Sequence, residues 1–193
     1  MQEFPKRKFA LSVAVLLVGG MTVLTADYLI KTYFPNRLIL EDLMFRVLPY
    51  WPGLSTIADG LVVMGMLLIG VFSRGKISRL SMVFFSFGFM MLCRGLLNLV
   101  TPLGDPSGDV EVYGFLERYP LVGMFPSGHT TSLVLEYLLI KDWAIGKRWE
   151  LLFIVLILLE IFTLLATHGH YSIDIVGGVI LGYFAVKAAK RYA

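Results

Sequence analysis

Two short motifs carry residue types that can do nucleophilic and acid–base chemistry on phosphorus. The first is Phe125-Pro126-Ser127-Gly128-His129-Thr130, in which proline followed by serine is typical of a helix start. Unpaired backbone amides and the positive end of the helix dipole make such a start a good binding site for phosphate. Gly128 lets an anion approach the backbone closely, and His129 falls in the first turn beside it.

The second motif is His168-Gly169-His170-Tyr171-Ser172-Ile173-Asp174. Residues four apart share a helix face, so Asp174 can accept a hydrogen bond from one nitrogen of His170. The other nitrogen is then a nucleophile for phosphorus, and the carboxylate stabilises the cation that develops on the ring. His129, from another helix, is placed to protonate the leaving oxygen. We therefore predict a catalytic site of His129, His170 and Asp174.

The composition places these motifs in a membrane. A chain of 193 residues that is 57% hydrophobic and only 16% charged is too apolar for an ordinary soluble domain. Its basic residues lie in short loops rather than in one patch, which excludes nucleic acid as a partner. We expect an all-α polytopic membrane protein with one domain, residues 1–193, and six transmembrane helices. The expected spans are Phe9–Ile30, Thr56–Phe72, Leu80–Val100, Ser127–Ile140, Leu151–Thr167 and Ile173–Ala189.

Charge bias orients this bundle. Twelve of the 17 lysines and arginines fall on the side of the two termini, four fall on the other side, and Arg94 lies near the outer end of the third span. The positive-inside rule then places both termini in the cytoplasm and the two motifs on the extracytoplasmic or lumenal face. This topology is compatible with a bacterial inner membrane, the Golgi, the endoplasmic reticulum or the plasma membrane. It is also compatible with a homo-oligomer.

Two connections between spans carry further expectations. The segment Leu40–Phe45 is expected to lie as a short amphipathic helix along the interface. The long outer loop gathers the acidic residues Asp105, Asp109, Glu111 and Glu117.

Three carboxyl groups, those of Asp59, Glu136 and Glu160, fall within the expected spans, where an ionisable group is costly and usually faces the interior of the bundle. Glu136 lies seven residues after His129, about two turns further on the same face. These groups either line a polar chamber for a lipid headgroup or choline-like cation, or are protonated and bonded between helices.

Metal binding is an alternative for the second motif, with His168, His170 and Asp174 as ligands of zinc or manganese. No cysteine or acidic cluster completes a recognisable metal motif, so we expect neither a metal nor another cofactor.

The motifs resemble those of the type 2 phosphatidic acid phosphatase superfamily. Pro126-Ser127-Gly128-His129 is similar to its second motif, and His170-x-x-x-Asp174 is similar to the end of its third. Two cations of that family are missing, because Phe87 and Thr163-Leu164 stand at their places. The sphingomyelin synthase branch lacks them too, and the chain resembles that branch from about Glu41 to Phe184.

This resemblance implies a lipid phosphotransferase that moves a phosphoalcohol from a glycerophospholipid to ceramide or another lipid hydroxyl through a phosphohistidine at His170. It implies that Arg94 neutralises phosphate oxygens, that Ser127 either donates to phosphate or only caps its helix, and that Tyr171 contacts the headgroup. A phosphatase or phospholipase C that uses water as acceptor is the first alternative. A lipid-binding or transport protein without the chemistry is the second.

Overall fold

The computed structural model describes residues 3–107 and 123–192, and every regular element in these ranges is a helix. Six of the helices are long, and between the first two lie a five-residue helix, α2 (Leu43–Val47), and a 3-10 turn, η1 (Pro52–Leu54). The long helices are α1 (Glu3–Tyr33), α3 (Ser55–Ser73), α4 (Ile77–Val100), α5 (Gly128–Asp142), α6 (Lys147–Ala166) and α7 (Ser172–Tyr192).

Five of these helices, α1, α3, α4, α6 and α7, are long and apolar enough to cross a membrane. Large apolar side chains such as Leu17, Leu67 and Leu158 are exposed on their outer faces, where a soluble protein would place polar residues. The prediction of an all-α polytopic membrane protein is thereby confirmed.

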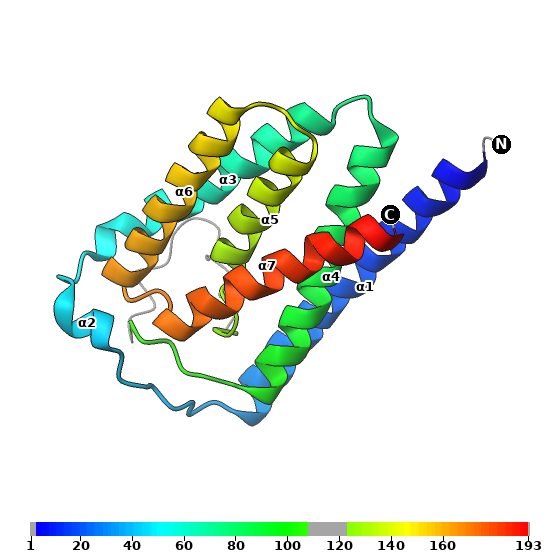
Figure 1. Cartoon of the computed structure of the whole chain (residues 1–193). Coiled ribbons are helices and arrows are strands. Elements are labelled where there is room, and N and C mark those ends of the chain that lie inside the picture. Colours follow the sequence, from blue (N-terminus) through cyan, green and yellow to red (C-terminus); the bar gives the residue numbers. More distant parts are fainter. Residues whose placement is uncertain (1–2, 108–122, 193) are drawn as a thin grey trace.

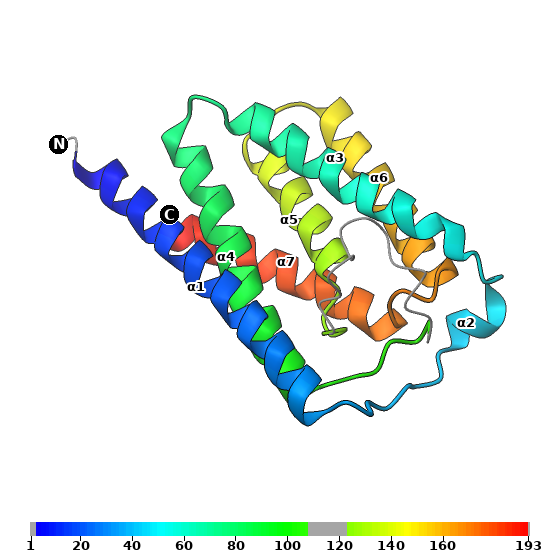
Figure 2. The ribbon, with the colours of Figure 1, turned by 180° about the vertical axis from the view of Figure 1, so that it is seen from behind.

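The sixth expected span corresponds to α5, whose 15 residues extend about 22 Å, less than the hydrocarbon core of a bilayer. Figures 1 and 2 show α5 in the middle of the bundle, between α3 and α6 on one side and α4 on the other, with α7 across it. Leu133, Leu135, Leu139 and Ile140 on α5 are fully buried. A helix enclosed by protein need not match the bilayer thickness, so the count of six spans stays a prediction.

The bundle has two distinct ends. At one end, called here the site end, α5 and α7 begin and α4 and α6 finish, while both chain termini lie at the far end (Figure 1). Two connecting segments, residues 37–42 and 102–105, cross the site end without forming a helix or strand. They are joined by a hydrogen bond in which the Gly104 amide donates to the Leu38 carbonyl over 2.9 Å. Beyond α2, the Trp51 amide donates to the Ala166 carbonyl over 2.7 Å and so ties the start of η1 to the end of α6.

The expected interfacial helix over Leu40–Phe45 is displaced. Helix α2 begins only at Leu43, because the Asp42 side chain accepts a hydrogen bond from the Met44 amide and caps it there. Residues 37–41 form no helix or strand, and the backbone of Asp42 is extended. In the acidic outer loop, Asp105 is described, whereas Asp109, Glu111 and Glu117 lie outside the described residues.

Glycines on α7 allow α5 to approach closely. A Cβ atom added at Gly178 would lie 3.0 Å from the Ser127 carbonyl oxygen and 3.0 Å from the Thr130 Cβ. Phe125 and Pro126 lie against the adjacent Gly177 in the same way. Small residues at helix contacts are the usual means of close packing in membranes, and here they bring the starts of α5 and α7 together.

We predict that Gly178→Val forces these helix starts apart. Overpacking of this kind costs about 1–3 kcal/mol of unfolding free energy, so thermal unfolding in detergent, followed by tryptophan fluorescence, is expected several degrees lower. Gly70→Val is the matched control, because nothing lies within 4 Å of a Cβ atom at Gly70 and the helix-propensity cost is shared. Equal effects of the two substitutions would contradict the argument.

Candidate active site

His170 and Asp174 form a buried pair at the start of α7. His170 lies just before the helix, and its Nδ1 is 3.2 Å from Oδ2 of Asp174; the two side chains are 5% and 0% exposed. The same carboxylate oxygen accepts the Tyr171 amide over 2.9 Å. This second bond fixes the carboxylate, and the carboxylate in turn fixes the ring. Nε2 of His170 is therefore the nitrogen left for attack on a substrate.

His129 has a carboxylate partner of its own, from a different helix. In the first turn of α5, its Nε2 is 3.0 Å from Oδ1 of Asp59, which lies near the start of α3. The Asp59 side chain is 2% exposed, so a charge there is shielded from water. The sequence marked Asp59 as an ionisable residue inside a span but did not reveal its partner. A carboxylate at this position stabilises a protonated His129, as a general acid requires.

The two histidines face one another across the site end. Their ring centroids are 6.3 Å apart and the ring planes are inclined by 65°. Reacting atoms approach to about 3–3.5 Å before bond formation, so a phosphate ester bound between the rings can place its phosphorus near His170 and its leaving oxygen near His129. The structure thus brings together the three residues predicted to be catalytic.

Ser127 connects the two histidine-bearing segments. Its amide donates to the Asp174 carbonyl over 3.0 Å, which ties the start of α5 to the start of α7. Its Oγ accepts the Thr130 amide over 3.3 Å, and its carbonyl accepts the Thr131 hydroxyl over 2.6 Å. Ser127 is fully buried, and it caps α5 as the sequence indicated.

Arg94 lies beside the first turn of α5. It donates from Nε to the Pro126 carbonyl over 3.0 Å and from Nη2 to the Gly123 carbonyl over 2.7 Å. A Cβ atom added at Gly128 would lie 3.2 Å from Arg94 Nε, so the guanidinium group and the glycine are neighbours. The arginine therefore adds a fixed positive charge next to His129.

Tyr171 is fixed on the other side of the second motif. Its hydroxyl donates to the Gly104 carbonyl and accepts the Leu40 amide, each over 3.0 Å. The side chain is buried, and burial raises the pKa of the phenol above its ordinary value. These bonds join the two connecting segments to the residue after His170. Tyr171 thereby helps to position His170.

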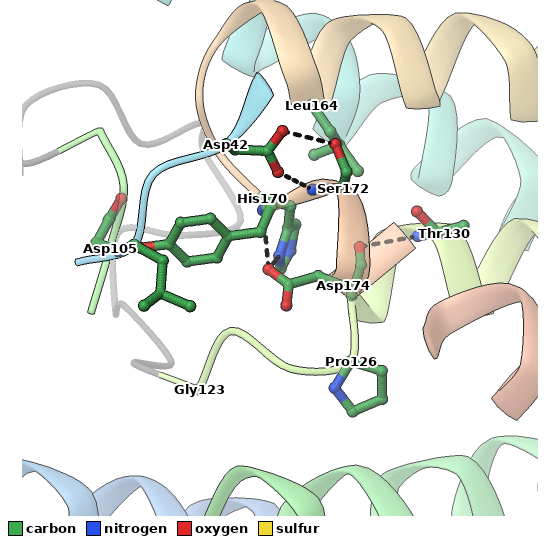
Figure 3. Close-up of polar contacts among 12 residues, drawn as sticks. Asp42, Asp105, Gly123, Pro126, Thr130, Leu164, His170, Ser172 and Asp174 are labelled. Atoms are coloured by element: carbon green, nitrogen blue, oxygen red, sulfur yellow. Dashed lines mark hydrogen bonds and ion pairs between the residues drawn. The ribbon is translucent and has the colours of Figure 1, made fainter. Parts of the chain in front are cut away.

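Asp42 holds the start of α7, a contact that sequence reasoning missed. Its carboxylate accepts the Ser172 amide over 2.6 Å and the Ser172 hydroxyl over 2.9 Å (Figure 3). Burial opposes ionisation, but the hydrogen bonds from Ser172 and Met44 outweigh it and lower the pKa of Asp42. An ionised Asp42 is thus also placed favourably at the positive end of the α7 dipole.

His168 is separated from the His170–Asp174 pair. Its ring stacks between Phe45 and Tyr50, with centroid distances of 4.3 and 4.8 Å. Burial lowers its pKa, and the charge of Asp42 offsets this only in part. Within residues 3–107 and 123–192, no three His, Cys, Asp or Glu side chains converge as a metal site. The alternative ligand set of His168, His170 and Asp174 therefore has no geometric support there.

Two further predicted carboxyls are fully buried in the bundle, Glu136 on α5 and Glu160 on α6. Glu136 lies against α3, because a Cβ atom added at Gly65 would be 2.1 Å from its Oε2. Neither oxygen of Glu136 has a hydrogen-bond partner within the described ranges. A buried carboxyl without such a partner favours either a proton of its own or a cationic ligand.

Comparison with known proteins adds an independent line of argument. Residues 124–191 match the family described as PAP2 superfamily C-terminal. The chain is 34% identical over 108 residues to phosphatidylcholine:diacylglycerol cholinephosphotransferase 2 of Arabidopsis thaliana, covering 54% of this chain and 35% of that protein. It is 28% identical over 153 residues to phosphatidylcholine:diacylglycerol cholinephosphotransferase 1 of the same plant, covering 76% and 50%.

The chain spans half or less of the length of these two relatives. The segment matched by the family contains α5, α6 and α7, and with them His129, His170 and Asp174. The resemblance to the sphingomyelin synthase-like branch of this superfamily, inferred from the two motifs, is confirmed.

The contact between Asp59 and His129 generates a specific prediction. Asp59→Asn keeps the shape of the side chain but removes the charge that stabilises a protonated His129. In an assay of headgroup transfer, we expect kcat to fall roughly 100-fold while KM changes little.

Asp27→Asn is the matched control, since Asp27 on α1 forms an ion pair with Lys31 and lies outside the candidate site. It should leave kcat unchanged. If Asp59→Asn also turns over at the wild-type rate, the contact with His129 has no role in the chemistry.

Proposed function

Since residues 124–191 carry a PAP2 superfamily C-terminal domain, we propose that the protein is a membrane lipid phosphotransferase. It moves a phosphoalcohol headgroup from a glycerophospholipid to a lipid hydroxyl, that of diacylglycerol or ceramide. The observation that carries this proposal is the His170–Asp174 pair, with His129 facing it at a ring separation of 6.3 Å. The names of the two relatives support a choline headgroup and a diacylglycerol acceptor.

The first half of the proposed reaction uses all three residues. Nε2 of His170 attacks phosphorus, and the bond from phosphorus to the glycerol oxygen breaks. His129 passes its proton to that oxygen, so diacylglycerol leaves as a neutral alcohol. Asp174 balances the positive charge on the substituted ring, which now carries the phosphoalcohol. Arg94, fixed beside Gly128, neutralises charge on the phosphate oxygens.

The second half reverses these roles. The acceptor hydroxyl attacks phosphorus while His129, now neutral, takes its proton. The bond between phosphorus and His170 breaks, and both histidines return to their starting states. An acceptor that reaches the site from the bilayer suits a His170 that is only 5% exposed. Water in place of the lipid hydroxyl gives the hydrolytic alternative.

The bundle supports a location and an orientation as parts of the same proposal. Lys141, Lys147, Lys187 and Lys190 lie at the far end, and under the positive-inside rule these lysines support a cytoplasmic location for that end and both termini. The site end then faces the extracytoplasmic or lumenal side and draws its substrates from that leaflet.

The decisive assay resolves all lipid products by mass. Purified protein in mixed micelles receives phosphatidylcholine, phosphatidylethanolamine and phosphatidylglycerol, with labelled diacylglycerol or ceramide, in the presence of chelator. We expect headgroup transfer to a labelled acceptor, and loss of at least about 10³-fold of it in His170→Asn. We also expect wild-type protein that carries the phosphoalcohol on His170 to survive quenching without acid, and we expect no such species in His170→Asn.

His168→Asn is the matched control, because the His168 ring packs against Phe45 and Tyr50, whereas Asp174 pairs with His170. It should retain transfer. Release of diacylglycerol and free phosphoalcohol alone would instead establish the hydrolase, and no turnover by folded wild-type protein would favour the lipid-binding alternative.

Glu136 provides a test of headgroup selection. We propose that this buried carboxyl, two turns from His129 on α5, ionises when a cationic headgroup binds beside it and so helps to select that headgroup. Glu136→Gln should lower the ratio of kcat/KM for phosphatidylcholine to that for phosphatidylglycerol about tenfold. Glu150→Gln, which removes a carboxylate paired with Lys147 at the far end, should leave the ratio unchanged. An unchanged ratio in Glu136→Gln would mean that the carboxyl serves packing alone.

A further inference from the structure

A groove of about 490 Å³ opens between the C-terminal halves of α5 and α7, away from the candidate site. Its apolar wall is formed by Leu138, Tyr183 and Val186. Its charged lining consists of Lys141, Asp142, Lys187 and Lys190. A volume of this size falls within the range of small-molecule sites, and the lining joins an apolar surface to a cationic one.

The groove lies at the far end of the bundle. Lys187 is thirteen residues beyond Asp174 along α7, which corresponds to a rise of about 20 Å. Lys141 is twelve residues beyond His129 along α5, or about 18 Å. Both helices start at the site end and diverge toward the ends that carry these lysines (Figures 1 and 2). A ligand in the groove would therefore belong to the opposite leaflet.

The groove is lined by more positive than negative side chains. Lys190 on α7 forms an ion pair with Asp142 on α5, and both residues line the groove. Lys141 and Lys187 have no acidic partner within the described ranges. Their ammonium groups lie 5.9 Å from the centroid of Tyr137 and 5.8 Å from the centroid of Tyr183, respectively. The three lysines and one aspartate leave the lining two positive charges in excess.

We propose that this groove binds an anionic phospholipid of the leaflet opposite the site. Lys141 and Lys187 contact the phosphate from the two helices, and the acyl chains follow the wall of Leu138, Tyr183 and Val186. A zwitterionic lipid is disfavoured, because its ammonium group would meet the same lysines. Lysines at helix ends commonly interact with membranes in general, but here two of them flank one groove whose lining also includes an interhelical ion pair.

Native mass spectrometry of the full chain tests this binding without reference to catalysis. Protein released from nanodiscs of phosphatidylcholine with a fifth of phosphatidylglycerol should retain one phosphatidylglycerol. We expect Lys141→Gln/Lys187→Gln to reduce its apparent affinity about tenfold or more, measured by titration with short-chain phosphatidylglycerol. Lys76→Gln/Arg148→Gln, which removes two basic residues of the same end from outside the groove, should bind as the wild type does.

Three results would overturn the proposal. Equal loss in both double variants would show general surface attraction, and equal retention of phosphatidylcholine would show that the groove does not select charge. Displacement by inorganic phosphate at the concentration of the short-chain lipid would show an anion site that makes no use of the apolar wall.

A second variant protects the test against misfolding of the lysine double variant. Leu138→Trp fills the apolar wall and leaves every charge in place. It should also lose the retained lipid while it elutes as the wild type does on size exclusion. If folded Leu138→Trp retains as much phosphatidylglycerol as the wild type, the acyl chains do not lie against this wall.

Discussion

The close approach of α5 and α7 at the site end is the constraint on which the rest of the candidate site depends. One hydrogen bond, from the Ser127 amide to the Asp174 carbonyl over 3.0 Å, joins the two helix starts, and Gly178 leaves the space for it. His129 follows Ser127 by two residues, and His170 precedes Asp174 by four. The separation of 6.3 Å between the imidazoles is thus set by backbone contact rather than by flexible side chains, which is how a site holds reacting groups in register.

At the site end, the buried ionisable side chains of this apolar chain are paired with one another. Each histidine of the site has a buried carboxylate, Asp59 from α3 and Asp174 from α7. Asp42 is held by Ser172 in a similar way. Groups of this kind are tolerated in a membrane protein when they are paired, because an uncompensated buried charge costs several kcal/mol. The two histidines of the candidate site, their partners and the loop contacts therefore form one polar layer above an apolar core to which α3, α4, α5, α6 and α7 all contribute.

How well each contact could be predicted from the sequence depends on how far apart its two residues lie along the chain. The His170–Asp174 pair and the Ser127 cap are local, so spacing and residue type were sufficient to infer them. The Asp59–His129 pair joins residues 70 apart. Hydropathy marks Asp59 as a buried polar residue, but only the packing of α3 on α5 reveals which group it meets. The bonds of Tyr171 to Gly104 and Leu40 are equally non-local. For α5, hydropathy suggested a span, whereas its central position explains why a helix of 15 residues suffices there.

The opposite nitrogens used by the two histidines fit the proposed division of labour. His170 is bound to its carboxylate through Nδ1, and a backbone amide holds the same oxygen, so the ring is fixed within one short segment. A nucleophile that carries a covalent phosphoalcohol between two lipids benefits from this rigidity, because Nε2 must return to the same line of attack in both halves of the reaction. His129 is bound through Nε2 to a carboxylate on another helix. Its contact with Asp59 therefore depends on the packing of α3 against α5, where Glu136 also lies against Gly65. Under the proposed mechanism, contacts between helices position the acid–base partner, and contacts within one segment position the nucleophile.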